Sequence, residues 1–142
     1  MNCMFLGHRD AGGEAKETVK TAILDLIEKE KIDAFLVGNN GNFDFYVQCV
    51  LQEMKEAGAD IRFCIVLSYL GEKALSGNQS ETVFPEGLEN TIPKYAISKR
   101  NEWMIKNASY LIAYVKHNFS HTKKWIDKAK KRGLTVIDLA DM

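Results

Sequence analysis

Hydrophobic positions follow two alternating patterns along the chain. Short, nearly continuous apolar runs are typical of strands covered on both faces, and longer segments with an apolar position every three or four residues are typical of amphipathic helices. The runs predict strands at residues 2–6, 34–37, 61–67, 109–115 and 134–139. The longer segments predict helices at residues 14–30, 43–57 and 96–107, and a last helix that Ser120 or Thr122 caps and that ends near Arg132.

The order of these elements predicts an α/β fold. Strands and helices alternate as β-α-β-α-β, then after a long crossing as α-β-α-β, which favours a parallel sheet with helices on both faces. The long crossing suggests that the chain returns to the middle of the sheet and restarts beside the first strand. We therefore expect one domain over residues 1–142, a Rossmann-like three-layer sandwich with five parallel strands in the order 3-2-1-4-5. The alternative is a flavodoxin-like order, 2-1-3-4-5.

Residues 68–93 interrupt this alternation. They contain both prolines and three glycines, and they show little periodicity. A segment of this length inside a compact domain is usually a functional loop or a disordered one. Two interpretations stay open: a lid that covers the ligand site, and an inert loop.

The balance of charge argues against recruitment by a polyanion. Nineteen Lys and Arg residues balance nineteen Asp and Glu residues, although six cations cluster at residues 123–132. The chain as a whole therefore has no field that attracts nucleic acid or an anionic membrane. No stretch resembles a signal peptide or a membrane span. We expect a cytoplasmic protein without a membrane partner, and we do not expect nucleic acid as its partner.

The predicted strand order places a crevice between the first and fourth strands, at their carboxyl ends. The loop after the second strand should reach it, and this loop favours an anion because free backbone N–H groups and a helix N-terminus meet there. The candidate binding residues of the loop are Gly38, Asn39, Asn40, Gly41, Asn42 and Asp44. Asp44 could accept ribose hydroxyls or act as a general base, but carboxylates also favour helix N-termini without any such role.

Two other loops should converge on the crevice. Gly7, His8 and Arg9 follow the first strand, where Arg9 could hold a phosphate in bidentate fashion. His8 could donate to a ligand oxygen, act as an acid or base, or only brace its loop. The loop after the fourth strand contributes His117, Ser120 and Thr122.

Arg100 and Asn101 are candidates on a helix rather than in a loop. They lie on the same helical face as the apolar Ile97, three and four residues after it. Burying an arginine without a partner is costly. Arg100 therefore needs either an anionic ligand or an ion pair, for which Asp44 and Asp10 are the candidates.

Motifs for metals and common cofactors are missing from the sequence. His117 and His121 have a spacing that can suit a metal, but no third ligand is obvious. GxGxxG, GxxxxGK[ST] and GxSxG are all absent. We therefore expect neither a metal site nor a resident cofactor.

Five motifs in a fixed order resemble one protein family. They are FLGHR at 5–9, VGNNGNFD at 37–44, FPEGLE at 84–89, AISKRNEWM at 96–104 and AYVKHNF at 113–119. Together they resemble the YpsA-like branch of the SLOG superfamily, which groups the DNA-processing protein DprA with the LOG-type phosphoribohydrolases. The resemblance implies a Rossmann-like fold, nucleotide-derived ligands and often self-association, so a homo-oligomer is possible.

The chain departs from the wider family in three places. Asn39 and Asn42 replace glycines of a loop that often reads GGxxGFD. The run Ser120-His121-Thr122 stands where members often have Gly-Gly-Ala. The PGGxGTxxE signature of the LOG-type enzymes is absent.

Three functions follow as hypotheses. The first is binding or sensing of a nucleotide or a nucleotide-derived small molecule. The second is cleavage of the N-glycosidic bond of a nucleotide, as LOG-type enzymes perform it, with His8 or Asp44 as the catalytic acid or base. The third is a DprA-like nucleic-acid module, which only the cationic last helix favours.

Overall fold

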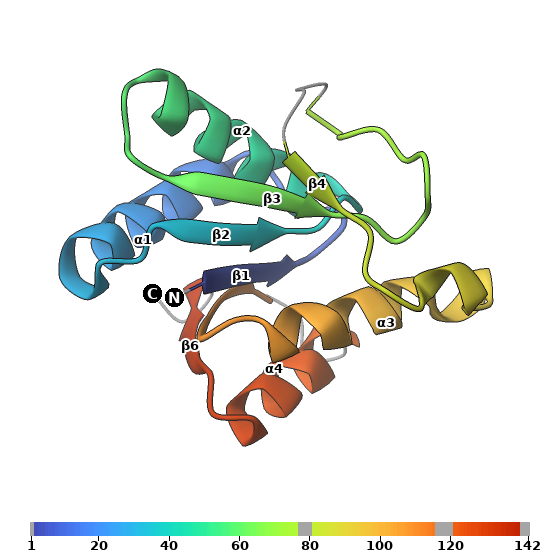
Figure 1. Cartoon of the computed structure of the whole chain (residues 1–142). Helices are drawn as coiled ribbons and strands as arrows, with labels where there is room; N and C mark the ends of the chain where they lie inside the picture. Colours follow the sequence, from blue (N-terminus) through green and yellow to red (C-terminus); the bar gives the residue numbers. More distant parts are fainter. Residues whose placement is uncertain (1, 77–80, 116–120, 140–142) are drawn as a thin grey trace.

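The computed structural model describes residues 2–76, 81–115 and 121–139, and within these ranges six parallel strands form one sheet with helices on both faces (Figure 1). The strands are β1 (Asn2–Gly7), β2 (Ala34–Val37), β3 (Arg62–Val66), β4 (Glu81–Val83), β5 (Tyr110–Tyr114) and β6 (Thr135–Asp138). The helices are α1 (Glu14–Glu30), α2 (Asn42–Glu56), α3 (Pro93–Lys106) and α4 (His121–Lys131), with a short 3-10 helix η1 (Leu88–Asn90) before α3.

The predicted α/β class with a parallel sheet is confirmed, but the predicted number of five strands is wrong, and the complete strand order differs from the predicted one. The sheet order is β4-β3-β2-β1-β5-β6, and the additional strand β4 comes from the segment that we expected to be a loop. It pairs with β3 through three residues, two of them exposed. A strand so short and polar leaves no periodic signal in the sequence.

The five predicted strands keep the expected order among themselves, β3-β2-β1-β5-β6. The central strand β1 pairs with β2 on one side and with β5 on the other, where Cys3–Gly7 are in register with Tyr110–Tyr114. The flavodoxin-like alternative would pair the first strand with the third, and it is therefore excluded.

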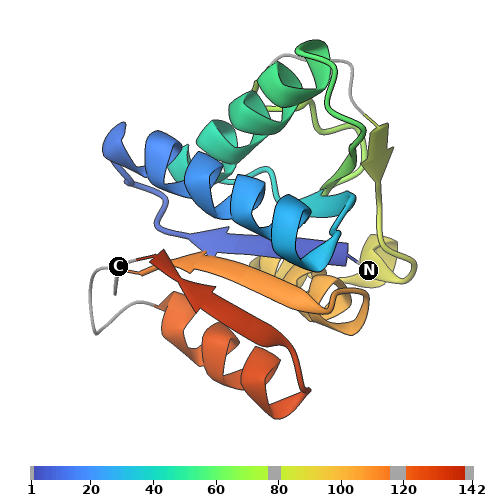
Figure 2. The same ribbon diagram turned by 90° about the vertical axis from the view of Figure 1, so that its left-hand side faces the viewer.

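Strand β1 illustrates why the central strands are apolar throughout. Alternate residues of a strand point to opposite faces of its sheet. Cys3 and Phe5 belong to the buried cluster that α1 and α2 cover, whereas Met4 and Leu6 belong to the cluster on the face of α3 and α4. Figures 1 and 2 show these two helix layers on opposite sides of the sheet. No helix within the described ranges is both long and apolar enough to cross a membrane.

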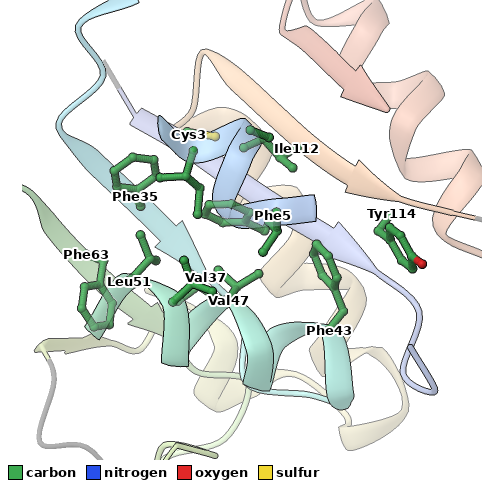
Figure 3. Close-up of a cluster of buried hydrophobic side chains, with 14 of the residues drawn as sticks. Cys3, Phe5, Phe35, Val37, Phe43, Val47, Leu51, Phe63, Ile112 and Tyr114 are labelled. Carbon is green, nitrogen blue, oxygen red and sulfur yellow. The ribbon is translucent and has the colours of Figure 1, made fainter. Parts of the chain in front are cut away.

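The larger cluster lies between the sheet and the first helix layer (Figure 3). Helix α2 places Val47 and Leu51, one turn apart, against the side chains of Phe35 and Val37 from β2. Every one of these side chains is buried. Because the apolar stripe of α2 is fixed against the sheet in this way, the first turn of α2 is held at the carboxyl ends of β1 and β2.

Two backbone hydrogen bonds join the loop after β1 to the start of α2. Asn42 N donates to Arg9 O over 2.8 Å, and Phe43 N donates to His8 O over 3.4 Å. The ring of Phe43 then lies parallel to that of Tyr114 at the end of β5, with the ring centres 5.8 Å apart (Figure 3). These contacts bring the ends of β1, β2 and β5 together.

Glycine is required at position 7 by this packing. A Cβ atom at Gly7 would overlap the ring of Phe43, which is 1% exposed and cannot swing into solvent. A Cβ atom added at Gly13 would have no atom of the described residues within 4 Å, and the backbone of Gly13 is already helical, with φ −60°.

We predict that Gly7→Ala destabilises the protein by about 1–3 kcal/mol, because overpacking forces buried neighbours to move. The matched control, Gly13→Ala, should stay within about 1 kcal/mol of wild type, because alanine fits that conformation. Urea unfolding of both variants measures the difference. Equal free energies of unfolding for the two variants would contradict the packing argument.

Candidate functional site

A cavity of about 280 Å³ opens at the carboxyl edge of the sheet, between the loops after β1 and β2 and the helices α3 and α4. Seven of its lining residues were predicted from the sequence: Gly7, Arg9, Asn40, Asp44, Arg100, Asn101 and Thr122. Sequence reasoning missed three apolar ones, Leu6, Ile97 and Trp125. The cavity thus combines two arginines and one carboxylate with an apolar wall.

Arg100 is the most unusual residue of this cavity. It is 3% exposed, and its guanidinium donates from Nη1 to Asn40 Oδ1 and from Nη2 to Asn101 Oδ1, the latter over 3.0 Å. Its Nε has no hydrogen-bond partner among the described residues. A buried donor without an acceptor costs about 1–3 kcal/mol, and more on a charged group. The sequence prediction that Arg100 and Asn101 face the interior is confirmed.

Asp44 provides the negative charge of the cavity. It is 6% exposed, and its Oδ2 accepts a hydrogen bond of 2.9 Å from the backbone N–H of Asn40. Burial raises the pKa of this carboxyl group, and Arg100, the Asn40 N–H and Arg9 oppose that rise. Burial also lowers the pKa of Arg100, against the attraction of Asp44 and Glu72.

The ion pair that we considered for Arg100 is not formed as a direct contact. Its direct partners are two neutral amide oxygens, and no carboxylate of the described residues lies within ion-pair distance of its guanidinium. Asp10, the other carboxylate that we considered, is exposed. Asp44 acts on Arg100 through its charge across a short gap.

Gly38 makes room for that arrangement. A Cβ atom at Gly38 would lie 2.7 Å from Asp44 Oδ2 and 2.9 Å from Arg100 Nη1. Any side chain here would push the carboxylate or the guanidinium out of place. Gly41, with φ 91°, leaves room in the same way for Arg9, because a Cβ atom at Gly41 would lie 2.6 Å from the Cα atom of Arg9. These two glycines position charged groups, although neither lines the cavity.

The expected free backbone donors at the start of α2 are largely engaged inside the protein. Asn40 N–H donates to Asp44, and the N–H groups of Asn42 and Phe43 donate to the carbonyls of Arg9 and His8. An anion in the cavity would therefore depend on the arginine side chains more than on this loop. The sequence could not reveal the last two of these bonds, because their acceptors come from a loop about thirty residues earlier.

Asn39, a predicted binding residue, makes hydrogen bonds inside the protein instead. Its Nδ2 donates to Glu72 Oε2 over 2.7 Å and to Lys73 O over 2.8 Å, and its Oδ1 accepts from Leu75 N over 2.8 Å. Asn39 does not line the cavity. It anchors the chain after β3, and Glu72 Oε1 accepts further hydrogen bonds from Ser68 and Tyr69 at the start of the same segment.

Gln48 completes this anchor and was missed in the sequence. It is fully buried, donates from Nε2 to Gly38 O and Asn39 Oδ1, both over 2.9 Å, and accepts from Ser76 N over 3.1 Å. A signal was present, because Gln48 lies one turn after Asp44 on the buried face of α2. A glutamine on such a stripe needs buried partners.

The remaining predicted residues lie at the margin of the cavity or outside the described ranges. His8 is half-buried beside the ring of Tyr114, with 6.4 Å between ring centres, and it does not line the cavity. Asn42 is exposed and donates to Ala11 O over 3.3 Å. His117 and Ser120 lie outside the described residues, as does the side chain of His121. No group of three potential metal-ligating side chains occurs within the described ranges.

A second, smaller hollow of about 230 Å³ lies between α3 and α4. Three cations line it, Lys106, Lys128 and Arg132, and Lys128 Nζ lies 4.6 Å from the centre of the Trp125 ring. The carboxylate of Glu102 also lines this hollow, and Lys99 lies 3.7 Å from it. Two of the six cations of the cluster at 123–132, Lys128 and Arg132, therefore border this hollow, and Trp125 lines both the hollow and the main cavity.

Comparisons of the chain with protein-family models, with curated proteins and with solved structures find no match. The geometry of the cavity is therefore the main guide to function.

We predict that Asn39→Ala lowers the free energy of unfolding by about 1–3 kcal/mol, because it removes the acceptor of Leu75 N and one of the two acceptors of the buried Gln48 Nε2, together with the donor to Glu72 and Lys73 O. It should also speed hydrogen exchange at residues 69–75. The matched control Asn42→Ala removes one long bond at an exposed site and should change stability by less than about 0.5 kcal/mol. Thermal melts with hydrogen-exchange mass spectrometry test both variants, and unchanged exchange in Asn39→Ala would refute the anchor.

Proposed function

We propose that the cavity binds the anionic group of a nucleotide or a nucleotide-derived small molecule. The observation that carries this proposal is the Nε of Arg100, which has no partner among the residues that the structure describes and belongs to a charged side chain that is 3% exposed and lines the cavity. A phosphate or carboxylate oxygen is the acceptor that such a group favours, because a charge-assisted hydrogen bond to guanidinium is among the strongest in proteins. Arg9 lines the same cavity and supplies a second cation.

The location and the walls of the cavity support a nucleotide over a bare anion. Ligands of doubly wound α/β folds bind beyond the carboxyl ends of the strands, where the strand order reverses, and β1 is the strand at which the order reverses here. Leu6, Ile97 and Trp125 offer an apolar surface beside the arginines, as a base or ribose would require. The resemblance to the YpsA-like branch points to the same ligand class.

Titration calorimetry with AMP and ADP-ribose tests the proposal. Arg100→Lys keeps the positive charge but loses the planar guanidinium, and Arg9→Ala removes the second cation; each should weaken binding roughly tenfold to a hundredfold. Lys99→Ala is the matched control, since Lys99 is an exposed cation next to Arg100 in the sequence. Unchanged affinity in both arginine variants, with only the melting temperature lowered, would leave the arginines as structural residues and overturn the proposal.

Hydrolysis of a nucleotide is a second candidate function, which the position of Asp44 favours. Buried carboxyl groups with raised pKa values are typical of general acids and bases. The other candidate, His8, does not line the cavity.

If the protein is a phosphoribohydrolase, it should convert AMP and water into adenine and ribose 5-phosphate, and Asp44→Asn should abolish that release. Chromatography of the reaction mixture measures free adenine, and Asp10→Asn, an exposed carboxylate change nearby, is the control. No adenine above the uncatalysed background would rule out this candidate and leave binding alone as the proposed function.

A further inference from the structure

We propose that a bound anion and ionised Asp44 compete for the charge of Arg100, so that anion binding in the cavity takes up a proton at Asp44. The inference rests on the proposed function, because it requires an anion at Arg100. It assigns Asp44 a role opposite to that of a ligand acceptor: the carboxylate opposes the ligand until it is protonated.

The geometry places both groups at one point of the cavity. Asp44 Oδ2 and Arg100 Nη1 lie on the two sides of the space above Gly38, 2.7 Å and 2.9 Å from a Cβ position there. Both residues line the cavity, and both are almost fully buried. Because Arg100 and Asp44 line the same cavity and are both almost fully buried, an anion bound against Arg100 would lie in the same small space as the carboxylate of Asp44, and burial weakens the screening of their repulsion.

The charged and polar groups that face Asp44 come from helix α3, the loop after β1 and its own loop. Arg100 faces it from α3 and Arg9 from the loop after β1, while its own loop adds the N–H dipole of Asn40. Glu72, from the chain after β3, acts on Arg100 rather than on Asp44. The lining residues from α4 are Thr122 and Trp125, which carry no charge. Among the described lining residues, two cations and one titratable carboxyl group thus set the charge of the cavity.

This balance decides which state of Asp44 accepts an anion. With Asp44 ionised, the two arginines and the carboxylate sum to a single positive charge, which a dianion would exceed. With Asp44 protonated, the same dianion is neutralised. Burial already raises the pKa of Asp44 in the free protein, and a bound anion must raise it further, because a nearby like charge disfavours the ionised form.

The sign of the pH dependence follows from linkage. The complex holds more protons than the free protein at pH values between the pKa of Asp44 in the free protein and its higher pKa in the complex. Affinity should therefore fall as the pH rises through that interval, which begins above the ordinary carboxyl value of 3.8. Above the higher pKa the affinity should level off. A carboxylate that accepts hydrogen bonds from ribose hydroxyls predicts the reverse, since ionisation would then strengthen binding.

Asp44→Asn separates the two roles. Asparagine has nearly the same shape, and its Oδ1 can still accept the N–H of Asn40, but it carries no charge. If Asp44 opposes the ligand, the variant should bind an anion more tightly than wild type and without pH dependence. If Asp44 accepts ligand hydroxyls, the variant should bind more weakly.

The experiment is calorimetric titration of ADP-ribose in two buffers with different ionisation enthalpies, repeated between about pH 5 and pH 8. The pyrophosphate of ADP-ribose does not titrate in this interval, so any proton taken up belongs to the protein. We expect net proton uptake by wild type and none by Asp44→Asn. At the upper end of the interval the variant should bind roughly tenfold more tightly, because a bound anion should raise the proton affinity of Asp44 by the same factor. The control Asp10→Asn should keep the uptake of wild type.

The outcomes separate this inference from the proposed function. Binding of ADP-ribose that depends on Arg100 but takes up no proton in either buffer would overturn the inference and keep the function, and so would weaker binding by Asp44→Asn. No binding of ADP-ribose by wild type at any pH would overturn both. The wild-type measurement decides the proton uptake even if the variant does not fold.

Discussion

The burial of Arg100 next to Asp44, on the two sides of Gly38, is the constraint on which the crevice depends. The arginine comes from α3 and the carboxylate from α2, so the pair joins the two helix layers across the edge of the sheet. It can form only because β5 returns beside β1 and brings α3 to that edge. Neither group could be buried alone at an acceptable cost, and Gly38 is the position that lets both approach.

A second polar network holds the chain that leaves β3. Asn39 binds both Gln48 and Glu72, and Asn39 and Gln48 also bind the backbone of the segment that leads toward β4. Their hydrogen bonds are made inside the protein, whereas Arg100 keeps one donor without an acceptor among the described residues. We take this difference to distinguish the anchor from the binding group that we propose, although Asn39 of the anchor and Asn40, which holds Arg100, are neighbours in one loop. The side chains of Gln48 in α2 and of Asn39 in the loop before it therefore hold residues 73–76, in the first half of the segment 68–93.

Periodicity was sufficient to predict the central elements from the sequence, because strands covered on both faces and helices with one apolar stripe repeat over many residues. The same logic identified Arg100 and Asn101, since a polar residue on an apolar stripe must be buried. It failed for β4, whose three residues form no pattern. It also failed for the role of Asn39, which depends on Glu72 and Leu75, more than thirty residues away. Gln48 obeyed the rule that revealed Arg100, and the same argument would have found it.

The choice of partners for Arg100 explains how the cavity keeps a positive charge. Its two terminal nitrogens donate to the amide oxygens of Asn40 and Asn101, which satisfy hydrogen-bonding geometry without cancelling charge. Carboxylates in those two places would have neutralised the site and left no attraction for a ligand. Among the described residues that line the cavity, Asp44 is the single carboxylate, and burial raises the pKa of its carboxyl group. We therefore propose that a buried arginine held by neutral acceptors attracts an anion here, and that protonation of the carboxyl group beside it controls this attraction.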